Sequence, residues 1–229
     1  MRSLEYLDVY DVEAYSLPKG CFKKNTEYYS WQCEKIILPK TLTAISEECF
    51  YCTSIKEVRI PVSCETIGVS AFERCKSLNS VSFENGSRLK TISSSAFASC
   101  QSLKTITIPA SCETIGDNTF SRCSSLTDFS CAGESALTSV GAGAFKYCGV
   151  LHRIDMQGCK KLAAVGSKAF DGDDQIYSFQ IGAVVPPSCQ ADTFGNVGEY
   201  SVLKVPSGSE DAYKAASGWS GFYKIIADE

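Results

Sequence analysis

The sequence lacks the features that mark several common classes of protein. Its 229 residues contain no run of about 18 apolar residues, so no segment predicts a transmembrane helix. The formal net charge is −4 and no basic tract is present, which argues against nucleic acid or anionic membranes as partners. No targeting signal is visible, because Met1-Arg2-Ser3-Leu4 leads into acidic and aromatic residues. Two readings stay open: an intracellular protein, or a mature or trimmed chain whose signal has been removed.

An internal repeat dominates what is present. Residues 103–123 read LKTITIPASCETIGDNTFSRC and residues 55–75 read IKEVRIPVSCETIGVSAFERC. Both units place apolar residues first, fourth and sixth, then Pro, Cys and Ile-Gly, and close on Phe-x-x-Cys. Successive units begin, mostly 22, 23 or 25 residues apart, at Leu4, Cys33, Ile55, Leu78, Leu103, Leu126, Leu151 and Ile176. A fixed period of this length predicts one elongated array that builds its core coil by coil.

Each unit predicts a strand followed by a turn. Apolar residues alternate in Ile55-x-x-Val58-x-Ile60, which is typical of a strand with one buried face, and Pro61 then ends it. The second half of a unit is too short for an independent helix, so we expect a helical or 3₁₀ turn there. We expect the glycines of this turn to supply a backbone conformation that other residues resist; they are Gly68, Gly116, Gly141 and Gly166. The fold class is therefore an α/β solenoid: a right-handed superhelix with short parallel strands, and turns or 3₁₀ segments on its convex side.

The chain divides into three parts on this reading. Residues 1–32 form a degenerate first repeat or N-terminal cap, in which Leu4-x-x-Leu7-x-Val9 fits a strand. Residues 33–182 are the repeats. Residues 183–229 form a C-terminal cap with one last strand at Leu203-Lys204-Val205 and a short helix for which Ser209 is the expected N-cap.

The thirteen cysteines follow the repeat more than they follow any redox motif. Four of them recur at the closing place of consecutive units, namely Cys75, Cys100, Cys123 and Cys148. Disulfides or a metal are one reading, but coils about 4.8 Å apart exceed the Cβ separation of about 3.8 Å that a disulfide needs. We predict a reduced, buried ladder, and the same role for Cys64 and Cys112. The odd number leaves at least one cysteine unpaired within a monomer.

The remaining cysteines are read individually. Cys49 and Cys52 make a formal Cys-x-x-Cys, but no second pair lies at zinc spacing, so a structural role is expected, with Cys52 near the ladder place. No common motif relates the others, and an exposed one among them could be reactive; they are Cys21, Cys33, Cys131, Cys159 and Cys189.

Other possible chemical sites are weak. The single histidine, His152, falls at a variable second place of its unit, which argues against a Ser-His-Asp or Cys-His hydrolase. Asp171-Gly172-Asp173-Asp174 lacks the downstream Glu of a calcium loop and predicts a solvated turn. Asn85-Gly86-Ser87 predicts a turn, or a glycosylation site in a eukaryotic secretory protein. We expect no catalytic residue, no metal site and no cofactor.

The face of the sheet that points away from the core is the better functional candidate. Places three and five of each unit should project from the concave side, and the residues there are mostly small and polar. A merely solvated sheet explains them, as does a binding strip whose best part is the C-terminal half, with Asp128, Arg153 and Asp155. The predicted binding residues are Glu57, Arg59, Ser80, Ser82, Thr105, Thr107, Asp128, Ser130, Arg153, Asp155, Ser178 and Gln180. A second candidate is the aromatic group near the N-terminus, Tyr28, Tyr29 and Trp31, which cap packing also explains.

The repeat resembles the leucine-rich repeat of BspA-like bacterial surface proteins. The likeness covers about Cys33 to Ile181 and rests on Leu-x-x-Ile-x-Ile-Pro, a spaced Ile-Gly and Ala-Phe-x-x-Cys. What this resemblance implies is a cell-surface or secreted module. Its partners would be a protein or glycan, such as host extracellular matrix or another cell.

The functional prediction is a non-enzymatic interaction module that binds through the concave sheet, with adhesion as the implied biology. A structural spacer within a longer surface protein is the alternative, and an enzyme is a less favoured one.

Overall fold

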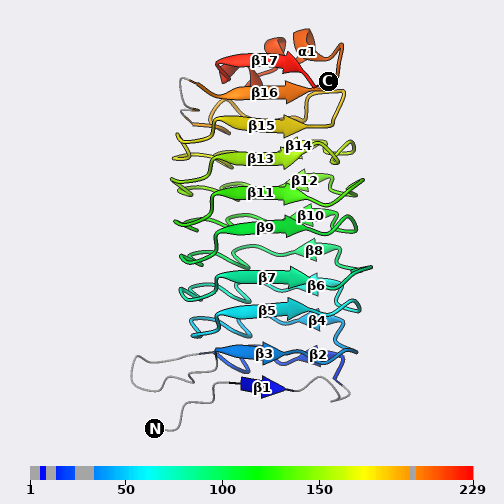
Figure 1. The fold of residues 1–229 in the computed structure, drawn as a ribbon, viewed down its shortest axis with the longest axis vertical. Helices are drawn as coiled ribbons and strands as arrows, with labels where there is room; N and C mark the ends of the chain where they lie inside the picture. The colour runs from blue at the N-terminus through cyan, green and yellow to red at the C-terminus, as the bar shows by residue number, and fades with distance from the viewer. Residues whose placement is uncertain (1–5, 9–13, 24–33, 196, 198–199, 229) are drawn as a thin grey trace.

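The computed structural model describes residues 6–8, 14–23, 34–195, 197 and 200–228. The chain winds into an elongated stack of coils whose strands run parallel to those of the neighbouring coils (Figure 1). The predicted solenoid of short parallel strands is therefore confirmed. The aromatic group Tyr28, Tyr29 and Trp31 lies outside the described residues, as does Cys33.

The longer strands form one face of the stack, which we call the strand face. Its N-terminal sheet contains, in spatial order, β1 (Tyr6–Asp8), β3 (Lys35–Ile37), β5 (Glu57–Ile60) and β7 (Ser80–Phe83). Its C-terminal sheet contains β9 (Thr105–Ile108), β11 (Asp128–Cys131), β13 (Arg153–Met156), β15 (Ser178–Ile181), β16 (Val202–Val205) and β17 (Lys224–Ala227). The predicted alternation is confirmed, since Val58 and Ile60 are buried in β5 while Glu57 and Arg59 are exposed. The two sheets are separate because β7 and β9 are not hydrogen-bonded to each other.

A third sheet, which the sequence did not predict, runs beside the strand face through the same coils. Each of its strands has two residues, and the sheet is continuous across the boundary where the strand face divides. Its members are β2 (Ser16–Leu17), β4 (Ala44–Ile45), β6 (Thr66–Ile67), β8 (Thr91–Ile92), β10 (Thr114–Ile115), β12 (Ser139–Val140) and β14 (Ala164–Val165).

The segment after each short strand is a stack of turns. In the described repeats, the expected helical or 3₁₀ conformation is absent here, and two residues per coil adopt positive φ instead, such as Ser70 (53°) and Arg74 (61°). Alternate amides then point along the stack, so the Phe72 amide donates to the Ala96 carbonyl at 2.8 Å. This ladder between coils leaves few backbone groups for an i to i+4 helix, so the segment forms turns, which the predicted fold class allowed, and not a helix.

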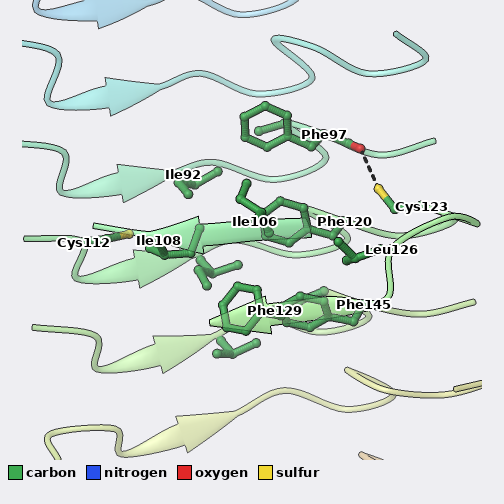
Figure 2. Close-up of a cluster of buried hydrophobic side chains, with 14 of the residues drawn as sticks. Ile92, Phe97, Ile106, Ile108, Cys112, Phe120, Cys123, Leu126, Phe129 and Phe145 are labelled. Atoms are coloured by element: carbon green, nitrogen blue, oxygen red, sulfur yellow. Dashed lines mark hydrogen bonds between the residues drawn. The ribbon is translucent and has the colours of Figure 1, made fainter. Parts of the chain in front are cut away.

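The core is built from repeated side chains that stack on their equivalents in the next coil. Phe72, Phe97 and Phe120 lie with ring centroids 5.2 and 5.6 Å apart and nearly parallel planes. Cys123 lies beside this column and its thiol donates to the carbonyl of Phe97 at 3.2 Å (Figure 2). Cys75, Cys100, Cys123 and Cys148 are all fully buried, so the predicted ladder of buried thiols is confirmed. Cys64 and Cys112 are buried as well.

The repeated glycines have a different cause from the one predicted. Gly68, Gly116, Gly141 and Gly166 do not have positive φ. They are glycines because the preceding coil passes too close: a Cβ on Gly166 would lie 2.3 Å from the Ala142 nitrogen, and one on Gly68 2.7 Å from the Ile45 oxygen.

We expect Gly166→Ala to lower the free energy of unfolding by about 2–3 kcal/mol, because the new methyl group meets backbone that cannot move alone. Chemical denaturation measures this. Gly149→Ala is the matched control, since its nearest neighbour would be 4.0 Å away, and should change stability by less than about 0.5 kcal/mol. Equal effects of the two substitutions would contradict the explanation by close approach.

The C-terminal segment continues the stack and closes it. The expected last strand is β16, and β17 adds a further strand that the sequence reading missed. The helix α1 (Glu210–Ala215) and a 3₁₀ turn (Trp219–Gly221) cover this end. Ser209 occupies the N-cap position, but its hydroxyl is buried and makes no capping hydrogen bond. The Trp219 indole instead donates to the Pro187 carbonyl at 2.8 Å.

Candidate functional site

The twelve predicted binding residues lie on the solvent side of the strand face. Strand pairing places them in two columns, as in Arg153 beside Ser178 and Asp155 beside Gln180. None of them is buried: eight are exposed, while Asp128, Ser130, Ser178 and Gln180 are half-buried. Side-chain direction follows from the two-residue period of a strand, which is why the sequence could place them. The division between β7 and β9 separates Glu57, Arg59, Ser80 and Ser82 from the other eight.

Cross-strand contacts order the C-terminal half of this face. The Arg153 guanidinium pairs with the Asp128 carboxylate, which also accepts a hydrogen bond of 2.7 Å from the Thr127 hydroxyl. Burial acts to raise the pKa of Asp128, but these two donors and the charge of Arg153 lower it overall. One strand earlier, the hydroxyls of Thr107 and Ser130 are 2.8 Å apart. The polar groups are thus held in defined positions before any ligand arrives.

Two hollows lie on the strand face between β3 and β9, and neither is at the pair of Asp128 and Arg153. The first, of about 560 Å³, is lined by Lys35, Ile37, Glu57, Arg59, Ser80 and Glu84 among others. The second, of about 500 Å³, lies where β7 and β9 separate, and its lining includes Ser82, Phe83, Thr105 and Thr107. Figure 1 shows β8 at a height between these two strands. The sequence favoured the C-terminal half, whereas these two hollows lie in the N-terminal half and at the boundary between the two sheets.

Exposed aromatic rings border the strand face near its C-terminal end, and the sequence reading missed them. Tyr177 and Tyr223 immediately precede β15 and β17 and are 48% and 71% exposed. The His152 ring stacks on Tyr177 with centroids 5.6 Å apart. The sequence contained a signal for these rings, because aromatic residues recur at the second place of neighbouring units. That place was interpreted as variable.

The described residues show no cluster suited to metal binding. No group of three or more His, Cys, Asp or Glu side chains among them is placed to hold a metal ion. Burial raises the pKa of the Cys64 thiol to about 11 and that of Cys112 to about 12, so both stay protonated and unreactive at neutral pH. Cys52 does not join the ladder: Thr53 does, and its hydroxyl lies 3.3 Å from the sulfur of Cys75.

Asp173 corrects another prediction. The stretch of residues 171–174 was expected to be a solvated turn, but Asp173 is 1% exposed and occupies the ladder place that follows Cys148. Neither of its carboxylate oxygens has a hydrogen-bond partner. Desolvation raises its pKa to about 8, and the neighbouring charges of Asp171 and Asp174 act in the same direction. The expected turn at residues 85–86 is present, with Gly86 at φ 76°.

Strands with one buried face, stacked phenylalanines in successive coils, and glycines where four of the coils approach closely define a leucine-rich-repeat solenoid. The chain belongs to the BspA type leucine rich repeat family, whose model matches six copies over residues 15–88 and 43–177. Comparison with curated proteins gives no match. No helix in the described ranges is long and apolar enough to cross a membrane.

Several solved structures are similar to this chain. The leucine rich repeat protein of T. pallidum is 26% identical, with a TM-score of 0.57 over 66% of this chain and 74% of its own length. A leucine-rich repeat protein from Bacteroides capillosus is 41% identical over 40% of this chain and 64% of its own, with a TM-score of 0.37. A leucine rich cell surface protein from Faecalibacterium prausnitzii is 18% identical over 98% of this chain and 60% of its own, with a TM-score of 0.42. The T. pallidum protein supports the solenoid fold.

Proposed function

We propose that this chain is a non-enzymatic protein-binding module that contacts its ligand with the strand face. The observation that supports this most directly is the regular exposure of polar side chains on successive coils, next to two hollows. A repeat solenoid offers such an extended surface for binding. The exposed rings of Tyr177 and Tyr223 add the kind of side chain that dominates binding energies in protein interfaces.

The family suggests the biological setting. We infer display at the cell surface or secretion, and adhesion to a protein or glycan of host extracellular matrix or of another cell. An enzymatic role has less support, because the single histidine, His152, stacks on the exposed ring of Tyr177.

A structural spacer is the second candidate function, and one observation favours it. Charged groups on the strand face already pair with one another, as Arg153 does with Asp128 and Arg59 with Glu84 at 3.4 Å. Binding a ligand there would have to replace these pairs, each worth about 0–1 kcal/mol at an exposed site.

We expect Arg153→Glu to weaken binding to a responsive partner by about tenfold or more, because it removes a cation and places two like charges on adjacent strands. The measurement is surface binding of the purified chain to a panel of extracellular-matrix proteins and glycans. Arg122→Glu is the matched control, since it makes the same change of charge on the turn side of the stack. Arg122 lies there over the ring of Tyr147. If Arg122→Glu weakens binding as much as Arg153→Glu does, the strand face is not the binding surface. If no member of the panel binds, the spacer function is favoured.

A further inference from the structure

Two cysteines in the N-terminal coils, which do not belong to the cysteine ladder, face each other. The sulfur atoms of Cys21 and Cys49 are 2.9 Å apart. Cys21 is exposed and Cys49 is buried, so one thiol of the pair meets solvent and the other lies behind it. The ladder thiols behave differently, because Cys100 and Cys123 donate to carbonyl oxygens of phenylalanines in the preceding coil.

The repeat explains how these two thiols meet. Cys21-Phe22 and Cys49-Phe50 occupy the place that Ala-Phe holds in later coils, and the rings of Phe22 and Phe50 stack with centroids 5.1 Å apart. The Phe22 amide donates to the Cys49 carbonyl at 2.9 Å, which fixes the distance between the two coils at this point. Since alanine fills the same place at residues 71, 96, 144 and 169, packing alone does not require sulfur here.

The contact is close to bonding distance. A disulfide bond is about 2.04 Å long, so the sulfur atoms need to approach by about 0.9 Å. The first coil can supply this movement, because within the described part of the chain β2 lies at the end of its sheet and pairs with β4 alone. Two exposed or half-buried ion pairs flank the contact and hold the coils in register, Lys19 with Glu47 at 2.9 Å and Lys23 with Glu48 at 2.8 Å.

We propose that Cys21 and Cys49 form a reversibly oxidised dithiol, a modification site that exchanges with low-molecular-weight disulfides such as oxidised glutathione. The inference is independent of the proposed binding function. The Cys21 thiolate attacks one sulfur of the oxidant, which forms a mixed disulfide and releases one glutathione thiolate. The Cys49 sulfur then gives up its proton and attacks the Cys21 sulfur, which releases the second glutathione. The two protein thiols lose two protons and two electrons in total, and these convert one oxidised glutathione into two reduced molecules.

The electrostatics of the pair suit this order of events. The hydrogen bond from Cys49 lowers the pKa of Cys21, while the same contact and burial raise the pKa of Cys49. The exposed sulfur is therefore the attacking nucleophile, and the buried thiol resolves the mixed disulfide.

The test incubates the reduced full chain with a buffer of reduced and oxidised glutathione, followed by intact mass measurement and mapping of the linked peptides. We expect the loss of two hydrogens with a link between Cys21 and Cys49, and a rise in Tm of about 5 °C on oxidation, because the bond closes a loop between positions 28 residues apart. In Cys49→Ala, glutathione should stay attached to Cys21, because the resolving thiol is missing. Alanine is native at this place in later coils, so this variant should fold.

Cys52→Ser is the matched control, because it removes the other cysteine of the Cys-x-x-Cys and should leave the link intact. A link from Cys49 to Cys52, a link from Cys21 to Cys33, or the absence of glutathione on Cys21 in Cys49→Ala would each overturn the proposal.

Discussion

Replacing Asp173 by cysteine should stabilise the protein at pH 7 by an amount on the order of 3 kcal/mol. The substitution gives this coil the side chain found at the equivalent place in the four preceding ones. The carboxyl group of Asp173 is buried without a hydrogen bond, whereas a thiol there can donate to the carbonyl of Phe145, as Cys148 does to that of Phe120 at 3.1 Å. Chemical denaturation of the two proteins measures the gain.

The gain should depend on pH with a defined sign. The pKa of Asp173 is about 8 in the folded protein and near 3.9 in the unfolded chain. Between these values the folded protein holds a proton that the unfolded chain has released, so rising pH favours unfolding. The difference between Asp173→Cys and the native protein should therefore be small near pH 4, grow to about pH 8 and then level off.

The neighbouring carboxylate gives the control for this experiment. Asp174 is exposed, and Asp174→Asn should change stability by less than about 0.5 kcal/mol both at pH 4.5 and at pH 8. A stability difference between Asp173→Cys and the native protein that is the same at pH 4.5 and pH 8 would show that Asp173 is ionised in the folded state.

Phe120→Ala should cost about 3–5 kcal/mol of stability, because it removes a fully buried ring from the middle of the stack. Phe120 packs against Phe97 on one side and Phe145 on the other, with centroids 5.6 and 5.3 Å away (Figure 2). A solenoid coil contacts only its neighbours, so the substitution weakens both interfaces of one coil. We expect the denaturation curve to shift and to lose its single cooperative step.

An exposed aromatic residue of the next repeat serves as the reference for this loss. Tyr147 is 48% exposed, and Tyr147→Ala should cost less than about 1 kcal/mol. A cost of the same size for Phe120→Ala would mean that the phenylalanine column does not carry the cohesion between coils.

The strands of the strand face could be predicted because burial leaves a clear pattern in them. Val58 and Ile60 alternate with Glu57 and Arg59, and that alternation also told which side chains face solvent. Two-residue strands such as β6 carry no period, so nothing in the sequence separated them from turns. In β17 the neighbouring residues Ile225 and Ile226 do not match the repeat, and only pairing with β16 shows that they form a strand.

The sequence could predict which side chains of the candidate site face solvent, but not where the surface is hollowed. The columns of Thr105 and Thr107 follow from the strand period, whereas the hollow between β7 and β9 depends on the distance between coils, which no single unit encodes. Asp173 was misread for another reason: the ladder was identified by its cysteines, so a different residue at the same place was read as part of a loop. The contact of Cys21 with Cys49 could have been predicted by aligning the coils, because both residues occupy the place that alanine holds before phenylalanine in later coils.

The separation of β7 from β9 also decides where this rod can bend. Every other pair of neighbouring strands on the strand face is joined by hydrogen bonds, while at this boundary only the short-strand sheet and the stack of turns continue across. Flexing about this line breaks no backbone hydrogen bond of the strand face, so we expect the stack to bend most easily between Phe83 and Thr105. We therefore expect the N-terminal and C-terminal halves to change their relative tilt. A ligand that contacted both halves would bind across this hinge.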